Sequence, residues 1–453
     1  MGTVSRTKPL RVVIIGGSLS GLMCGIALKH AGHTVTICEK EDNERQSHMA
    51  GVCLGSDAEE FLLQHDRIVR PFSHTSLKVQ ALRDNNSVRV FVYAKRNVTN
   101  WDAFYFRLRS CFDGYISSHY PSPPDPVESD GAVKYEHLTE ALDISCDTDK
   151  GYPQMVLTFA NKATQKVFRM EADLVIAADG PNSFVRNKYL PKIQRQYVGY
   201  IAWRGTVHEK EVSASTRAVF VQNITLYMMP REHCVVYAIP GRDGTCEPGE
   251  RLLNFLWYTN ESAGSLEEIM TDAFDSRRHH NIVPAGHVRK DVWNRLLNKA
   301  QTKPLPAPLL DIIAKIKRPF IQVITELSSP RAAFENGRVL VVGDALSLYR
   351  PHTAFSATQA AFHALCVQRY VNGDISLHKW EGTVLRYALL HSSQSACYGK
   401  FYQHWVGIAL VAGLHYWLYC VIDKVMSFLN GEKSLLRSTI KVEIRSEGDE
   451  QHS

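Results

Sequence analysis

Three small residues and one acid near the start of the chain have types and spacing that point to chemistry. In "GGSLSG", Gly16, Ser18 and Gly21 nearly match the dinucleotide-binding fingerprint G-x-G-x-x-G, with serine replacing the second glycine. Such a turn presents backbone N–H groups and a helix N-terminus to a pyrophosphate. Glu39, about 20 residues on, can accept hydrogen bonds from ribose hydroxyls. The pattern predicts dinucleotide binding, against the alternative of a Rossmann unit that binds nothing.

The elements that must position these residues follow the order strand, turn, helix, strand. Residues 12–15 form an unbroken apolar run, as expected of a parallel strand buried on both faces. Residues 19–31 have helical spacing, and a second apolar run, 34–38, ends directly before Glu39. This order is typical of a Rossmann βαβ unit.

Two later segments also lead a buried strand into a turn that carries an acid. In "EADLVIAADGPNSFVR" the predicted strand 174–178 precedes Asp179, and the following helix carries a serine and an arginine. In "GRVLVVGDALSLYRPHTAFSATQA" the predicted strand 339–342 precedes a Gly-Asp pair that contains Asp344. A loop then leads to a helix that begins near Ala354.

Together, the three segments resemble the FAD-dependent group A aromatic monooxygenases, the superfamily of p-hydroxybenzoate hydroxylase. That family carries a glycine fingerprint, a D-G motif and a G-D motif in this order, and the resemblance spans about residues 10 to 400. The stretches "GYIAWRG", "WDAFYFRLRSCFDG" and "RPHTA" are similar to the branch of dihydroxypyridine and salicylate hydroxylases. The resemblance implies an α/β fold, with a Rossmann-type FAD-binding domain (GR2-like), an inserted antiparallel-sheet substrate domain and C-terminal helices.

The predicted domain organisation follows the motifs along the chain. The expected parts are the first part of the FAD-binding domain at 8–196, the substrate domain at 197–330, the second part of the FAD-binding domain at 331–400, an apolar helix at 401–430 and a polar tail at 431–453.

The resemblance also implies which residues hold FAD. Asp344 would bind the ribityl chain, and the segment of Asp179 would support the pyrophosphate region. Arg109 is the best match to the family arginine, because apolar residues follow it at helical spacing, and Arg107 is the less favoured choice. The predicted cofactor residues are Gly16, Ser18, Gly21, Glu39, Gly51, Arg109, Asp179, Asp344, Ala354 and Ala357, and no metal site is predicted.

Two departures from the family pattern lie in the helix after the G-D loop. Ala354 and Ala357 mark the start of this helix, whose N-terminus would point at the flavin pyrimidine and stabilise negative charge there. Ser356 stands where relatives usually have glycine, and His363 stands where they have an acid. These departures, with Ser18, keep open the alternative of a degenerate scaffold that has lost FAD.

The resemblance implies an NAD(P)H- and O2-dependent monooxygenase that acts on a phenolic or hydroxypyridine-like small molecule, with secondary metabolism as the expected setting. Only one glycine fingerprint is present, so NAD(P)H would be a transient co-substrate of the FAD enzyme. Reduced flavin and O2 would form a C4a-hydroperoxide, whose distal oxygen attacks an electron-rich ring. A second enzymatic possibility is epoxidation of an isoprenoid at a membrane.

The predicted catalytic residues lie in the expected antiparallel sheet and in the G-D loop. By resemblance to phenol-dearomatising relatives, Arg204 would hold a phenolate and Tyr237 would orient it. The alternative is an arginine paired with an acid and a tyrosine that belongs to the core. His352 is a rival base, because it follows the proline that lies beside the flavin in relatives. The alternative for His352 is a loop histidine bonded to the backbone.

Composition favours an intracellular enzyme and gives nucleic-acid binding little support. The net charge is +6 over 453 residues, and no dense basic tract is present. Ten cysteines are scattered without a C-x-x-C pair, which predicts reduced thiols and a cytoplasmic location. The polar start of the chain predicts no secretory signal.

The segment after the catalytic region is unusually apolar. Residues 404–422 approach the roughly 20 residues that span a bilayer, although His415 lies in the middle and Asp423 and Lys424 follow. Three arrangements are open: a helix packed on the body, an interfacial anchor and a spanning helix. The first is narrowly favoured.

Overall fold

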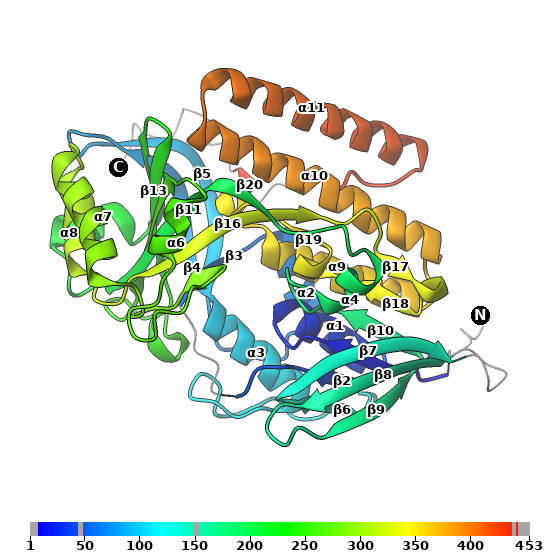
Figure 1. Cartoon of the computed structure of the whole chain (residues 1–453). Helices are drawn as coiled ribbons and strands as arrows, with labels where there is room; N and C mark the ends of the chain where they lie inside the picture. The colour runs from blue at the N-terminus through cyan, green and yellow to red at the C-terminus, as the bar shows by residue number, and fades with distance from the viewer. Residues whose placement is uncertain (1–7, 44–48, 148–153, 437–440, 443–453) are drawn as a thin grey trace, which may run out of the picture.

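The structure, a computed structural model, describes residues 8–43, 49–147, 154–436 and 441–442. Most of the predicted polar tail lies outside the described residues. Figure 1 shows a region of strands and helices around β2 and β10, a region of long strands beside it, and the two long C-terminal helices α10 and α11 along one side.

The three segments singled out in the sequence lie side by side in one mostly parallel sheet. Its strand order is β17-β18-β10-β1-β2-β6, and β1 pairs in parallel with both β2 and β10. β10 pairs in parallel with β18, so the turns that follow β1, β10 and β18 meet at the carboxyl edge of the sheet. The strands are β1 (Arg11–Ile15), β2 (Thr34–Cys38), β6 (Val133–Glu136), β10 (Leu174–Ala177), β17 (Ala333–Phe334) and β18 (Val339–Val341).

Helices and a small antiparallel sheet pack with the parallel sheet into one hydrophobic core. Helix α1 packs against β1, β2, α3 and α9, while β9 of the small sheet packs against β1. The chain therefore builds three layers around the carboxyl-edge turns (Figure 1). The elements are α1 (Leu19–His30), α2 (Ser56–His65), α3 (Trp101–Asp113), α4 (Phe184–Tyr189), α9 (Ser356–Val371), β7 (Thr139–Asp147), β8 (Gln154–Asn161) and β9 (Val167–Ala172).

A second, larger sheet is mainly antiparallel and draws strands from three parts of the chain. Its order is β15-β16-β11-β14-β13-β12-β4-β5-β20, with β3 beside β5 and β19 beside β16. β3, β4 and β5 come from before residue 196, and β4 pairs in parallel with β12. The strands are β3 (Gly51–Leu54), β4 (His74–Leu82), β5 (Val88–Asn100), β11 (Gln196–His208), β12 (Asn223–Met229), β13 (Glu232–Ile239), β14 (Leu252–Asn260), β15 (Ile282–Val283), β16 (Phe320–Ser328), β19 (Ser347–Leu348) and β20 (Lys441–Val442).

The two faces of this large sheet bury different cores, because successive side chains of a strand point to opposite faces. Trp203 and Trp257 belong to the outer core, which includes residues of helices α5 to α8. Tyr200 and Tyr237 belong to the inner core, where Ala354 of the G-D loop packs against them. The inner face is therefore the one that meets the predicted cofactor loops. The outer helices are α5 (Ala214–Phe220), α6 (Ser265–Ile269), α7 (Lys290–Thr302) and α8 (Ala307–Lys315).

Two long helices end the described fold. Helix α10 (Leu377–Gln403) runs along the body. The chain reverses direction at His404 and Trp405, and α11 (Val406–Leu429) returns along α10 (Figure 1). By length and composition alone, α11 is apolar enough to cross a membrane. The ten cysteines are all free in the structure.

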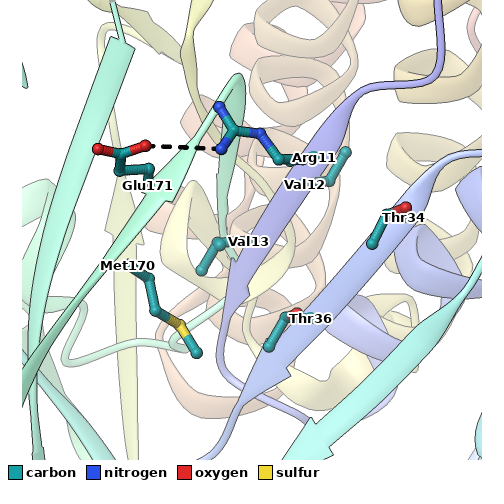
Figure 2. A pocket seen from close by; sticks show the side chains of 7 residues that line it. All are labelled: Arg11, Val12, Val13, Thr34, Thr36, Met170 and Glu171. Carbon is teal, nitrogen blue, oxygen red and sulfur yellow. Dashed lines mark ion pairs between the residues drawn. The ribbon is translucent and has the colours of Figure 1, made fainter.

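A cavity of about 220 Å³ lies between β1, β2 and β9 (Figure 2). Arg11 and Glu171 form an ion pair of 3.6 Å at its rim, and its other lining residues are apolar or threonine. It lies beside the start of β1, far from the carboxyl-edge turns where ligands of such sheets bind. We therefore regard it as a packing gap between the parallel sheet and the small antiparallel sheet, and not as part of the functional site.

Candidate functional site

The turn after β1 is shaped for close approach of the backbone. Gly16 has φ +98°, a conformation that L side chains rarely adopt. A Cβ atom there would lie 2.8 Å from Cα of Asp179 and would overlap the carbonyl of Ala178. A Cβ atom on Gly21 would overlap the carbonyl of Gly16, so this glycine lets α1 begin directly against the turn. Both glycines therefore permit close backbone contacts at this turn that any side chain would block.

Ser18 is the N-cap residue of α1, yet its side chain makes no capping hydrogen bond. The first N–H groups of a helix have no partner within the helix, and they carry the positive end of its dipole. Ser20, in the first turn of α1, has a buried hydroxyl without a hydrogen-bond partner, and it lies against Gly343 of the G-D loop. The start of α1 thus offers unsatisfied donors to an anion.

Glu39 is buried and holds the backbone of the turn. One carboxylate oxygen accepts a hydrogen bond of 2.8 Å from the N–H of Gly17, and the other accepts one of 3.0 Å from the N–H of Glu41. An ionised carboxylate offers about four acceptor sites, so ribose hydroxyls can still bind beside these two donors.

The two aspartates of the later turns keep unsatisfied oxygens. Asp179 accepts a hydrogen bond of 3.2 Å from Val185 N–H through one oxygen, while the other oxygen is buried without a partner. No hydrogen bond from a described residue reaches the carboxylate of Asp344. Burial raises the pKa of Asp344 to about 6, and Arg195 nearby opposes this rise.

These observations fit FAD. The glycines leave space that a Cβ would fill, and the orphaned oxygens of Ser20 and Asp179 lie at the junction of the three turns. A pyrophosphate suits the start of α1, and ribityl hydroxyls can donate to Asp344, whose carboxylate lacks a donor.

Arg109, and not Arg107, adjoins the glycine turn. Its guanidinium lies 3.6 Å from the ring centroid of Tyr135, and it pairs with Asp113 at 2.8 Å. The Tyr135 hydroxyl donates to the carbonyl of Gly17 at 2.8 Å, so Arg109 reaches the turn through this ring. Arg107 instead pairs with Asp66 at 2.7 Å.

The G-D loop is fixed by a residue that departs from the family pattern. His363 is buried in α9, and its Nδ1 accepts a hydrogen bond of 2.8 Å from the N–H of Gly343. Burial lowers the pKa of His363 to about 3, so it is neutral and can serve as this acceptor at pH 7. At the start of α9, Ala354 has a left-handed φ of 51°, Ala357 is buried and Ser356 is exposed.

Arg204 lies on the inner face of the large sheet without an acidic partner among the described residues. It is buried, its Nη1 donates to Gln322 at 2.8 Å, and its Nε has no partner. The ring centroid of Phe320 lies 4.9 Å from the guanidinium carbon. The alternative of an arginine paired with an acid is therefore absent from the described structure.

Tyr237 and a residue that the sequence reasoning missed lie close to Arg204. Strand β14 separates β11 from β13, with Arg204 opposite Leu256 and Tyr237 opposite Asn254. Asn254 is fully buried, and neither its amide oxygen nor its amide nitrogen has a partner. The hydroxyl of Tyr237 lies against Gly51, where a Cβ would overlap it, and burial raises the pKa of Tyr237. A polar residue at an alternate position of an apolar strand was the available signal for Asn254.

His352 belongs to an aromatic cluster and not to an open loop. Its Nε2 lies 2.8 Å from the hydroxyl of Tyr200, and burial brings its pKa well below the usual range. Its ring packs against His233, Tyr258 and Tyr402. The cluster brings together strands β11, β13 and β14, the G-D loop and the end of α10, a set that the sequence reasoning did not identify.

Comparisons with known proteins agree with this geometry. A family described as FAD binding domain matches residues 11–106, and one described as FAD binding domain-like matches residues 197–326. The chain is 28% identical over 381 residues to 2,6-dihydroxypyridine 3-monooxygenase of Paenarthrobacter nicotinovorans, an alignment that covers 82% of this chain and 86% of that relative.

Solved structures show the same fold. The chain matches 2,6-dihydroxypyridine-3-hydroxylase from Arthrobacter nicotinovorans with a TM-score of 0.73 and 24% identity, over 88% of this chain and 93% of that one. It matches a salicylate hydroxylase substrate complex with a TM-score of 0.64 and 16% identity, over 94% and 96% of the two chains.

The predicted fold class and the predicted cofactor, FAD, are confirmed, and the alternative of a cofactor-free scaffold loses its support. The chain thus carries FAD-binding domains, and in sequence and fold it is similar to FAD-dependent monooxygenases such as the dihydroxypyridine and salicylate hydroxylases.

Proposed function

We propose that this chain hydroxylates an ionised phenol or hydroxypyridine, with NAD(P)H as the reductant and O2 as the oxygen donor. The observation that carries the proposal is Arg204, a buried cation without an acidic partner among the described residues, on the sheet face that meets the cofactor loops. When bound, FAD accepts hydride and supplies the oxygen activation. The route of oxygen transfer expected from the family resemblance is part of this proposal.

Arg204 would hold the substrate as its anion. A free phenol has a pKa of about 10, and each unit by which a nearby cation lowers it corresponds to roughly 1.4 kcal/mol. The anion is the more reactive form, because its negative charge enters the ring and makes the ring a better nucleophile. The unpartnered Nε and the planar fork of Arg204 suit an oxygen anion held in one orientation.

Tyr237 and Asn254 would set the orientation of the ring. Asn254 presents an amide NH2 group and an amide oxygen, both without a partner, beside the tyrosine. The anion of a hydroxypyridine offers its ring nitrogen as a second polar atom beside the oxygen, whereas the anion of a plain phenol offers only its oxygen. Asn254 therefore favours the hydroxypyridine within the proposed substrate class.

His352 remains a candidate base with a smaller proposed contribution. Its lowered pKa keeps it neutral at pH 7, but a base of low pKa holds a substrate proton weakly. Its Nε2 is also engaged by Tyr200. We therefore assign the larger part of substrate ionisation to Arg204.

Epoxidation of an isoprenoid is the second candidate, favoured by the exposed apolar surface of α11. An alkene carries no charge, so it would leave Arg204 buried and unpaired. The same variants test both candidates.

The test compares Arg204→Lys and Arg204→Ala in NADPH-dependent turnover of phenols, hydroxypyridines and alkenes. Lys keeps the charge without the fork, so we expect a loss of kcat/KM of about 10-fold. Ala removes the charge, and a loss of several hundred-fold corresponds to the roughly 3–5 kcal/mol of a broken buried ion pair. FAD content should stay unchanged in both.

Arg318→Ala is the matched control, because Arg318 is exposed and bonds to the carbonyl of Ala285. It should retain parental turnover. Equal activity of all three variants on a phenolic substrate would show that the anion-clamp role is wrong. Alkene turnover that is equal in the parent and in both Arg204 variants would favour the epoxidase.

A further inference from the structure

Helix α11 leaves most of its apolar side chains outside, unlike a helix that covers a protein core. Its buried side chains are Ala412, Asp423 and Ser427, and Tyr416, Tyr419 and Cys420 pack against the body, whereas Leu414 and Trp417 are 68% and 64% exposed. A surface helix of a globular protein shows the opposite arrangement, with its apolar stripe facing inward. The outward face of α11 is therefore suited to an apolar environment and not to water.

The polar side of α11 is tied to α10. Asp423 lies 3.3 Å from Nε of Arg386 and accepts a hydrogen bond of 3.0 Å from Leu435 N–H. Nearer the start of the helix, the hydroxyl of Tyr416 accepts a bond of 2.9 Å from Gln394. These contacts hold α11 lengthwise along α10, on the outside of the molecule (Figure 1). An isolated spanning helix would leave Asp423 without these partners.

The outward arc is wide and nearly free of charge. At 100° per residue, its apolar side chains spread over roughly 200° of the helix circumference. Lys424 is the one charged residue on this arc of α11. Phe401 of α10 and Trp405 of the connection extend the surface, and Arg231 lies 5.1 Å from the Trp405 ring. The exposed apolar residues of α11 are Val406, Ile408, Leu410, Val411, Leu414, Trp417, Leu418, Val421, Ile422, Val425, Met426, Phe428 and Leu429.

A second copy of the chain is a poorer occupant of this surface than lipid. A partner helix covers the narrow seam of a coiled coil, and its pairing is set by charged residues on either side of that seam. Here the apolar arc is wider than such a seam and lacks those charges. A protein interface also has a polar rim around its apolar centre, which the arc does not provide.

We propose that α11 is an in-plane membrane anchor that inserts its outward arc into the interfacial region of a lipid bilayer. Tryptophan and arginine at the start of the helix, Trp405 and Arg231, are the residue types that favour the headgroup level. Insertion depends on burial of apolar area, with little help from charge, so anionic lipid and salt should matter little.

The test is flotation of the full-length, FAD-containing protein with vesicles of pure phosphatidylcholine and of phosphatidylcholine with phosphatidylserine. The parent should float with both at low and high salt. The double variant Leu414→Glu/Trp417→Glu should lose at least 10-fold in vesicle partitioning. The control Leu63→Glu/Phe274→Glu changes charge equally at side chains that are 87% and 76% exposed elsewhere, and should float like the parent. Because all four positions are exposed, both variants should keep their FAD absorbance and melting temperature.

A parent that stays at the bottom of the gradient overturns the proposal, as does equal loss in the two double variants. A parent that runs at twice the mass of one chain in solution and ignores vesicles would show instead that the arc is an interface between copies. Flotation with anionic vesicles only, abolished by high salt, would indicate electrostatic binding and would also overturn the proposal that the apolar arc inserts into the bilayer.

Discussion

Glu39 and Asp344 both follow a strand of the same parallel sheet, yet the protein treats their carboxylates in opposite ways. Glu39 accepts backbone hydrogen bonds through both oxygens. Asp344 has no hydrogen-bond donor among the described residues, and its pKa rises to about 6. The carboxylate of Glu39 has hydrogen-bond donors within the protein, whereas that of Asp344 can obtain them from a ligand.

The difference teaches how the cofactor site divides its tasks. A carboxylate that is already hydrogen-bonded stabilises the turn it holds, whereas one left without donors costs stability until a ligand supplies them. Substitutions at the two acids should therefore move protein stability and FAD affinity in different proportions and, in the case of stability, in opposite directions.

The largest expected effect lies at the turn that Glu39 supports. Gly16→Ala places a Cβ atom against Ala178 and Asp179 at a φ of +98°. We expect FAD affinity to fall by more than about 100-fold, since a clash and backbone strain of several kcal/mol must be relieved before the pyrophosphate can bind. The absorbance of the purified protein near 450 nm, a property of bound flavin, measures the outcome.

Gly114→Ala is the control for backbone strain alone. Gly114 also has a positive φ, 69°, but a Cβ there meets nothing within 4 Å. It should lower stability by about 1 kcal/mol and leave the protein yellow. If both variants lost FAD equally, close approach at Gly16 would not be the reason.

Asp344→Asn should weaken FAD binding by about 10-fold, because a charge-assisted hydrogen bond is replaced by a neutral one. The same variant should make the FAD-free protein more stable at pH 7, since it removes a charge that burial disfavours. Fluorescence titration with FAD and urea unfolding measure the two effects. A fall in both FAD affinity and the stability of the FAD-free protein would show that Asp344, like Glu39, supports the fold.

The pH dependence follows from the same group. The pKa of Asp344 is about 6 in the folded protein and about 3.9 in an unfolded chain. The folded state thus binds more protons between these values, and the FAD-free protein loses stability as pH rises from about 4 to 6. FAD binding favours the carboxylate, so affinity should rise through pH 6 and then level off. Asp344→Asn should flatten both profiles.

Glu39→Gln should have the smallest effect on FAD affinity and the opposite effect on stability. The amide keeps one acceptor and turns a donor toward a backbone N–H, so the free energy of unfolding should fall by about 1–3 kcal/mol. FAD affinity should change less than in Asp344→Asn. Fluorescence titration with FAD measures the affinity. A loss larger than that of Asp344→Asn would contradict the proposed division of roles between the two acids.

The cofactor half of the site could be predicted from local sequence because its signals are continuous. The apolar runs 12–15, 174–178 and 339–342 became β1, β10 and β18 to within a residue. Parallel strands buried on both faces must be apolar throughout, and the turns that follow them need glycine or a short acid.

The substrate half depends on strand register, which one sequence does not reveal. Asn254 becomes a candidate site residue only because β14 lies between β11 and β13 and turns the amide to the side of Arg204. The long-range pairing of β4 with β12 is likewise absent from any local pattern. By its type alone, His363 counts among the departures that leave open a scaffold without FAD, whereas in the structure it accepts a hydrogen bond from the Gly343 N–H.

The end of α10 has a consequence for how substrate would reach the enzyme. Gln403 contacts Nδ1 of His233 at 3.0 Å inside the aromatic cluster, and α11 begins three residues later at Val406. If α11 rests in a bilayer, an apolar phenol would arrive from a two-dimensional reservoir. Turnover would then follow the mole fraction of substrate in lipid, and added empty vesicles would slow it by surface dilution at constant total substrate.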